Sequence, residues 1–218
     1  MVRAYIFCEG KRDRLFLKRL IKDKKGITPY EIERERLDDL DDLLRCKHFE
    51  GVALVECGGF ITMLQNAARR SRDLASQPRV LPNADIFVVG DSDKVSKASF
   101  MQKLDGEIRK LRHKNPILNV REEGNERVLL ENLKEQGYTL RVFVLTVPNN
   151  LENQLADGIR RLFSREVKEL NDDDVVRFYC DRKYGCDEER MMAEDVDVVG
   201  PLLDSAWAKR IVDLIEDC

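Results

Sequence analysis

Residues 84–94 of the chain have the sequence Ala-Asp-Ile-Phe-Val-Val-Gly-Asp-Ser-Asp-Lys. The apolar residues 86–89 include two β-branched valines and run directly into a glycine, which is typical of a strand buried on both faces at the centre of an α/β sheet. Asp91 and Asp93 follow at the carboxyl end of this strand, where open α/β sheets bind their ligands. Two carboxylates separated by one serine can share a hard cation. Aspartate, serine and glycine are also ordinary turn residues, so a polar turn without a ligand fits the same stretch.

A second apolar run, at residues 4–8, also leads into an acidic residue. Glu9 and Gly10 follow it directly, and the glycine allows a sharp turn. Asp13 is placed to cap the helix that comes next. The buried stripe of that helix is predicted to consist of Phe16, Leu17, Leu20 and Ile21. Two buried strands that each deliver an acid to the carboxyl edge favour a metal site over two polar turns.

The motifs Glu9-Gly10-x-x-Asp13 and Asp91-Ser92-Asp93 together resemble those of the Toprim domain, over residues 3 to 165 of this chain. Toprim domains occur in topoisomerases, bacterial primases, recombination mediators, ribosomal-RNA maturation nucleases and the overcoming-lysogenization-defect (OLD) nucleases. The segment 147–152, Val-Pro-Asn-Asn-Leu-Glu, resembles the OLD-like members. The resemblance implies a three-layer α/β fold, in which helices flank a mainly parallel central sheet.

Three carboxylates that converge at one edge of a sheet suit phosphodiester cleavage. The reaction needs a cation to activate water and to neutralise charge on the phosphoryl oxygens, and two cations about 3.5–4 Å apart do both. We expect Mg²⁺ or Mn²⁺ to be bound by Glu9, Asp91 and Asp93, with Asp13 and Glu152 as outer or second-metal ligands. Glu9 could act instead as general acid or base, as the resemblance implies for some relatives.

Two further sets of residues are candidates for the site. OLD-type nucleases carry a late lysine thought to help catalysis, and Lys183 is the residue that this resemblance suggests here. Gly10, Gly58 and Gly59 allow close backbone approach, and the paired glycines leave amides free at the start of a helix, where a phosphate could dock. A tight turn with no ligand is the alternative for Gly58 and Gly59.

The composition predicts one domain with an appendage. The 218 residues are 43% hydrophobic, which is enough for a buried core. We place an α/β domain at 1–164 and an acidic C-terminal extension, packed on it, at 165–218. The extension has 16 acidic and 8 basic side chains, so it carries a net charge of −8 and leaves +5 on residues 1–164. This asymmetry makes nucleic acid an admissible partner for the first part of the chain.

The cysteines and the hydropathy pattern indicate in which cellular compartment the protein is expected. Six cysteines without a Cys-x-x-Cys pair are expected to be free thiols in a reducing compartment, with Cys8, Cys57 and Cys180 buried. No signal-peptide pattern occurs, nor any apolar run near the ~18 residues of a membrane span. We therefore expect a cytoplasmic protein that does not contact a membrane.

The remaining elements follow from periodicity and turn signals. Strands are expected at 52–57, 117–120, 140–147 and 175–180. Helices are expected at 99–113, 126–136, from 151 onward and at 205–215, and a loop at 181–185.

The function that these patterns favour is a Mg²⁺-dependent phosphodiester hydrolase, a nuclease, that acts on DNA or RNA. The sequence contains no Gly-x-x-x-x-Gly-Lys-Ser/Thr run, which is the phosphate-binding motif of many ATPases. The partner proteins that we consider are therefore a separate ATPase or a repair factor. A homo-oligomer is compatible with the sequence. The competing class is a non-catalytic module that binds nucleic acid or protein in DNA repair, replication or RNA processing. A phosphoacceptor receiver domain would have an acidic pair after its first strand, where this chain has only Glu9.

Overall fold

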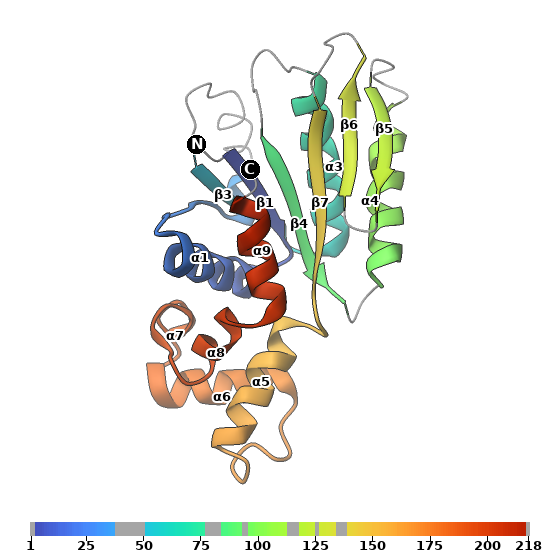
Figure 1. Cartoon of the computed structure of the whole chain (residues 1–218). Coiled ribbons are helices and arrows are strands. Elements are labelled where there is room, and N and C mark those ends of the chain that lie inside the picture. Colours follow the sequence, from blue (N-terminus) through green and yellow to red (C-terminus); the bar gives the residue numbers. More distant parts are fainter. Residues whose placement is uncertain are drawn as a thin grey trace.

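The computed structural model describes residues 3–37, 51–76, 84–92, 96–112, 118–124, 127–133 and 139–216. Within these ranges, seven strands form one sheet (Figure 1). Across the sheet their order is β2 (Tyr30–Ile32), β3 (Gly51–Glu56), β1 (Arg3–Cys8), β4 (Asp85–Asp91), β7 (Thr139–Val147), β6 (Arg127–Asn132) and β5 (Leu118–Glu123). The strands from β2 to β7 pair in parallel, and β5 and β6 extend the sheet as an antiparallel hairpin.

Helices cover both faces of the sheet, which gives the three-layer α/β architecture expected from the sequence (Figure 1). One face is covered by α3 (Phe60–Ser76) and α4 (Lys97–Arg112). The opposite face is covered by α1 (Lys11–Lys25) and α9 (Ala206–Glu216). The central strands are therefore buried on both sides, as their continuous apolar runs predict.

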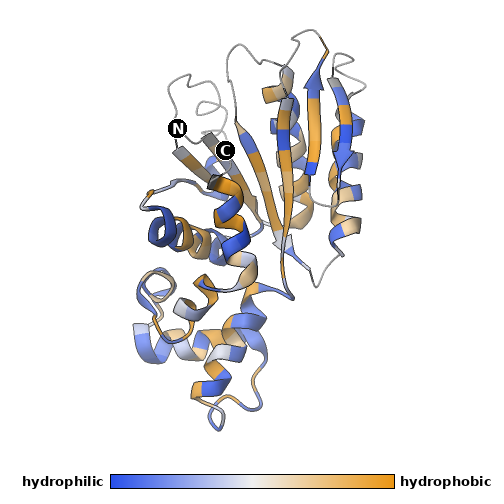
Figure 2. Ribbon diagram, in the orientation of Figure 1, coloured by the Kyte–Doolittle hydropathy of each residue, from blue (hydrophilic) through white to orange (hydrophobic). Residues whose placement is uncertain are grey.

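The alternation of side chains along β4 shows how the two cores are built. Phe87 and Val89 face the core under α1 and α9, whereas Ile86 and Val88 face the core under α3 and α4. All seven residues of β4 are buried. Figure 2 shows β4 as hydrophobic in its middle and hydrophilic at its ends. Both faces of β4 are therefore apolar and buried, as expected at the centre of a sheet that helices cover on both sides.

The four helices α5 (Leu151–Leu162), α6 (Asp172–Tyr184), α7 (Glu188–Glu194) and α8 (Val199–Leu203) follow the carboxyl end of β7. They lie beyond the carboxyl edge of the sheet, in the lower part of Figure 1. Their buried residues belong to the same hydrophobic cluster as β1, β4 and α1. The helices after β7 therefore pack onto the sheet domain through a shared core.

Two elements differ from the sequence-based expectation. The helix expected at 126–136 is wrong for residues 127–132, which form β6. Val128 and Leu130 lie in the core under α3 and α4, while β6 pairs with β7 on one side and β5 on the other. A short apolar run cannot be assigned to helix or strand by periodicity alone, and here the strand pairing decides.

The strand expected at 175–180 and the loop expected at 181–185 are also wrong, because residues 172–184 form α6. Asn171 caps this helix by accepting a hydrogen bond from the N–H of Asp174 at 3.0 Å. Three aspartates in the first turn favour a helix N-terminus, and Gly185 ends the helix with φ of 60°. Lys183 consequently lies in the last turn of a helix.

The free cysteines of the described residues match the expectation, since Cys8, Cys57 and Cys180 are buried thiols and Cys186 is exposed. Within the described part of the chain, the structure contains no helix with the length and apolar character that crossing a membrane would require.

Candidate functional site

Three parallel strands end side by side at the edge of the sheet that faces α5–α8. Glu9 follows β1, Asp91 is the last residue of β4, and the turn after β7 leads to Glu152 in the first turn of α5. Because β4 pairs with β1 on one side and with β7 on the other, these acids lie at neighbouring positions of one edge. This is the carboxyl edge, where α/β sheets form their binding sites.

Glu9 and Asp91 are in direct contact. The backbone N–H of Asp91 donates a hydrogen bond to Oε1 of Glu9 at 3.4 Å. The carbonyl oxygen of Glu9 accepts a second hydrogen bond from the N–H of Gly59 at 3.0 Å. Both acids are only 6% exposed. The hydrogen bond from Asp91 therefore holds the Glu9 side chain against the end of β4.

Asp13 joins this pair from the first turn of α1. Its Oδ2 accepts a hydrogen bond from the N–H of Gly10 at 3.1 Å, which satisfies a donor at the helix start. Burial raises the pKa of Asp13 to about 8, and the charges of Asp91, Glu152 and Glu9 act in the same direction, while the bond from Gly10 opposes them. Four carboxylates thus lie close enough to repel one another, and the cluster favours a proton or a cation.

The turn between β7 and α5 is tightly built. Asn149 adopts a left-handed conformation with φ of 58°, and its N–H donates to Oγ of Ser92 at 2.9 Å. The N–H of Ser92 in turn donates to the carbonyl of Val147 at 2.9 Å. Asn150 caps α5 by accepting a hydrogen bond from the N–H of Asn153 at 2.6 Å. These bonds fix the start of α5, and with it Glu152, relative to the end of β4.

Arg12 connects the acidic cluster to the helices beyond the sheet. Its guanidinium lies 3.4 Å from a carboxylate oxygen of Glu152 and 2.6 Å from one of Asp173, and it also pairs with Glu188. These three acids belong to α5, α6 and α7, and the Arg12 side chain is only 17% exposed. Although burial opposes the charged form, hydrogen bonds from Arg12 to Glu188 and Asp173 raise its pKa. Arg12 therefore remains a cation and balances one acid of the cluster.

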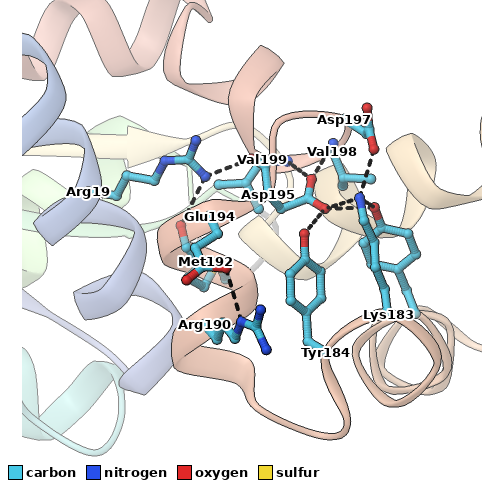
Figure 3. Close-up of polar contacts among 11 residues, drawn as sticks. Arg19, Lys183, Tyr184, Arg190, Met192, Glu194, Asp195, Asp197, Val198 and Val199 are labelled. Carbon is cyan, nitrogen blue, oxygen red and sulfur yellow. Dashed lines mark hydrogen bonds and ion pairs between the residues drawn. The ribbon is translucent and has the colours of Figure 1, made fainter.

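Lys183 makes its contacts elsewhere. Its ammonium group lies 2.9 Å from Oδ2 of Asp195 and 2.7 Å from Oδ2 of Asp197 (Figure 3). Asp195 is fully buried and also accepts hydrogen bonds from the hydroxyl groups of Tyr179 and Tyr184, each at 2.7 Å. Burial opposes ionisation of Asp195, but these donors outweigh it and lower the pKa of Asp195. The contacts of Lys183 thus tie α6 to the segment between α7 and α8.

The remaining predicted site residues are three glycines and Asp93. Gly10 and Gly59 contribute backbone donors to the cluster, to Asp13 and to the Glu9 carbonyl. Gly58 lies next to Gly59, with φ of 76°. Asp93 lies outside the described residues, so its position relative to Asp91 stays a prediction.

Cys8, the cysteine nearest in sequence to the cluster, does not have the properties of a nucleophile. Burial raises the pKa of the Cys8 thiol well above its ordinary value, and the charge of Asp13 raises it further. Since the thiolate is the reactive form, the neutral Cys8 is inert. The acids are therefore the groups of this edge that can do chemistry.

The donor types suit a hard divalent cation, because Mg²⁺ and Mn²⁺ prefer carboxylate oxygens. The raised pKa of Asp13 supports this fit, since a cation would offset the repulsion that raises it. Among the residues that the structure describes, however, no three acidic, histidine or cysteine side chains are arranged as a ready ligand set. A complete set would require rearrangement or a ligand from outside the described ranges, such as Asp93.

Sequence reasoning did not single out Arg12. The signal available was its place inside the Glu9-Gly10-x-x-Asp13 motif, one residue before an acid, where a cation is positioned to balance the cluster. Its partners Asp173 and Glu188 are more than 150 positions away in the chain, and no local pattern connects them with Arg12.

Fold and site together define a three-layer α/β protein with an acidic cluster at the carboxyl edge of its sheet. No family model matches the sequence, and no curated protein matches it either. A solved structure with some likeness is the C-terminal region of the Xanthomonas campestris pv. campestris OLD protein phased with iodine. It is 14% identical, with 100% of this chain and 95% of that chain covered and a TM-score of 0.43. A likeness this distant carries no argument about function.

Proposed function

We propose that this protein is a metal-dependent phosphodiester hydrolase that acts on DNA or RNA, with Mg²⁺ or Mn²⁺ as its cofactor. The observation that carries the proposal is the convergence of Glu9, Asp13, Asp91 and Glu152, from four elements of the fold, on one edge of the sheet. The motif resemblance to Toprim domains supports the same chemistry. The mutual repulsion of these acids disfavours the folded metal-free state, and the single bonds that Glu9, Asp13 and Glu152 make do not require four acids to gather at one edge.

The chain supplies distinct roles within this proposal. Glu9 and Asp91, with Asp93 and Glu152, would hold the cation, which would lower the pKa of a water molecule and neutralise phosphoryl oxygens. Asp13 carries a proton at neutral pH in the metal-free protein, because its pKa is raised to about 8. A carboxyl group with such a pKa can give up and take back a proton near pH 7, as general acid–base catalysis requires. Arg12 positions Glu152 through the ion pair at 3.4 Å.

The test is a cleavage assay with plasmid DNA, single-stranded DNA and structured RNA, each with Mg²⁺, Mn²⁺ or EDTA. We expect cleavage of at least one substrate with a metal ion and none with EDTA. Asp91→Asn should lower the rate by at least about 100-fold, because it removes a carboxylate from the site. Asp213→Asn serves as the matched control, since Asp213 is an exposed acid near the C-terminal end of α9.

Melting of the metal-free variants separates a catalytic from a structural role for Asp91. Removing one charge from a repelling cluster should leave the Tm of Asp91→Asn unchanged or raised. A marked fall in Tm, with activity lost only through unfolding, would contradict the proposal, and so would full cleavage by Asp91→Asn. Wild-type protein that binds nucleic acid but cleaves none of the substrates would indicate the non-catalytic binding module instead.

A further inference from the structure

Arg34 lies against the backbone of Gly58, close to the acidic cluster. It opens the short 3-10 helix η1 (Arg34–Arg36) directly after the edge strand β2. A Cβ atom added to Gly58 would lie 2.5 Å from Cδ and 2.7 Å from Nε of Arg34. No side chain fits at position 58 while Arg34 stays where it is, and the positive φ of Gly58 also disfavours one. The glycine thus leaves the space in which the Arg34 side chain lies.

The turn that contains Gly58 is hydrogen-bonded to the end of β1, where Glu9 lies. The N–H groups of Cys57 and Gly59, on either side of Gly58, donate to the carbonyl oxygens of Cys8 and Glu9 at 3.1 and 3.0 Å. The Arg34 side chain is therefore placed over a turn that is bonded directly to the end of β1. Its guanidinium lies beside Gly58, in the turn after β3 whose next residue, Gly59, binds the Glu9 carbonyl.

The charge of Arg34 is available to a ligand. Among the residues that the structure describes, no carboxylate forms an ion pair with Arg34, and its side chain is exposed. The neighbouring acids already have a cation: Arg14 pairs with Glu31, Glu33 and Glu56 through its buried guanidinium. Glu33, which precedes Arg34 in sequence, is thus engaged by another arginine. Within the described ranges, this arrangement leaves Arg34 able to bind an external anion.

We propose that Arg34 is the residue that binds the phosphodiester backbone of the nucleic acid next to the acidic cluster. This inference rests on the function proposed above, because it places the substrate at the same edge of the sheet. A polyanion that approaches several carboxylates requires a nearby cation, and a guanidinium can hold a phosphate through two parallel hydrogen bonds. Contact with the Gly58 backbone restricts the side chain before binding, so less conformational entropy is lost when the phosphate docks.

The experiment measures binding without cleavage. Fluorescence anisotropy with a fluorescein-labelled single-stranded DNA, with the corresponding duplex and with a structured RNA is recorded in EDTA at several salt concentrations. The variant is Arg34→Gln, and the matched control is Arg69→Gln, which removes the same charge from an exposed arginine farther along α3. Both variants should melt like the wild type, because both side chains are exposed.

We expect Arg34→Gln to raise Kd by about tenfold at low salt. It should also reduce the slope of log Kd against log salt by about 0.7 for single strands or about 0.9 for duplex, the loss of one phosphate contact. Arg69→Gln should stay within about twofold of the wild type. Arg34→Lys should recover the salt slope but only part of the affinity, since lysine cannot form the paired hydrogen bonds.

Three outcomes would overturn the inference: a wild-type protein that binds neither the DNA probes nor the RNA, an unchanged slope for Arg34→Gln, or equal losses for Arg34→Gln and Arg69→Gln. The function proposed above is judged separately by Asp91-dependent cleavage. Cleavage together with an unchanged Arg34→Gln slope would refute only the role of Arg34. Binding that depends on Arg34, without cleavage, would refute only the hydrolase.

Discussion

Asp13→Asn tests whether the acids of the metal-free cluster repel one another. Burial and the charges of Asp91 and Glu152 raise the pKa of Asp13 from 3.8 to about 8. The folded protein then holds a proton that the unfolded chain releases, so stability falls as the pH rises from about 4 to about 8. A pKa difference of one between the folded and unfolded states corresponds to about 1.4 kcal/mol, which gives an upper bound of about 5 kcal/mol at pH 7.5.

Relaxation and partial access to water reduce this bound, and we expect Asp13→Asn to stabilise the metal-free protein by about 2 kcal/mol at pH 7.5. For a chain of this size, that is a rise in Tm of about 4–8 °C. The amide oxygen of asparagine can still accept the hydrogen bond from Gly10, so the start of α1 is retained. At pH 4.5 the wild-type Asp13 is already protonated in the folded state, and the difference should nearly vanish.

The assay is thermal melting in EDTA at pH 4.5, 6.0 and 7.5 for the wild type, Asp13→Asn and the exposed control Asp213→Asn. A stabilisation that grows with pH for Asp13→Asn alone is the expected result. The reasoning is refuted if Asp13→Asn lowers the Tm at pH 7.5. It is refuted equally if its effect on the Tm is the same at all three pH values.

Two further predictions concern the cations of the fold. Arg12→Gln should destabilise the protein by about 2 kcal/mol and lower its Tm by about 4–8 °C, because three acids lose one partly buried partner. Arg190→Gln, which removes an exposed arginine paired only with Glu194 among the described residues, should change the Tm by no more than about 2 °C; equal losses for both variants would contradict the role of Arg12. Lys183→Met should destabilise the protein by about 1–3 kcal/mol, because the fully buried Asp195 loses its ammonium partner. If cleavage fell by more than about 100-fold with an unchanged Tm, Lys183 would have the catalytic role that the Toprim resemblance suggests.

The central strands β1 and β4 could be predicted from their own sequences. Residues 86–89 are apolar on both faces, as are residues 4–8, and only the middle of a sheet covered by helices buries such runs. Each run is followed directly by glycine and acids, which marks the carboxyl end. The parallel order then brings Glu9 and Asp91 to one edge, so their proximity follows from local patterns and topology alone.

The elements that could not be predicted depend on contacts far away in the sequence. The segment 127–132 has an apolar run that would suit a buried helix, and pairing with β7 makes it a strand. The segment 172–184 resembles a strand at its valines, although Asn171 and Gly185 were available as helix-capping signals. In both cases the short apolar run is ambiguous, and the distant strand pairing or the helix caps decide the element.

The charge asymmetry of the sequence has a different meaning in the folded protein. By net charge alone, the positive first part of the chain makes a polyanion partner admissible. Instead, acids of the last quarter pair with cations of the first part: Arg12 binds Asp173 and Glu188, Lys11 lies 3.3 Å from Glu189, and Lys24 lies 2.6 Å from Asp204.

Lys11, Arg12 and Lys24 therefore help to hold α6, α7 and the end of α8 against α1. Net charge is consequently a weak argument for nucleic-acid binding in this protein, and local geometry has to replace it. The position of Arg34 provides such a local argument. Within the described residues it has no acidic partner, and it lies against Gly58 next to the acidic cluster. The site also depends on the C-terminal helices. The guanidinium of Arg12 binds Glu152 of the cluster and, at the same time, acids of α6 and α7. Loosening these helices should therefore disturb the acids at the sheet edge before the sheet itself unfolds.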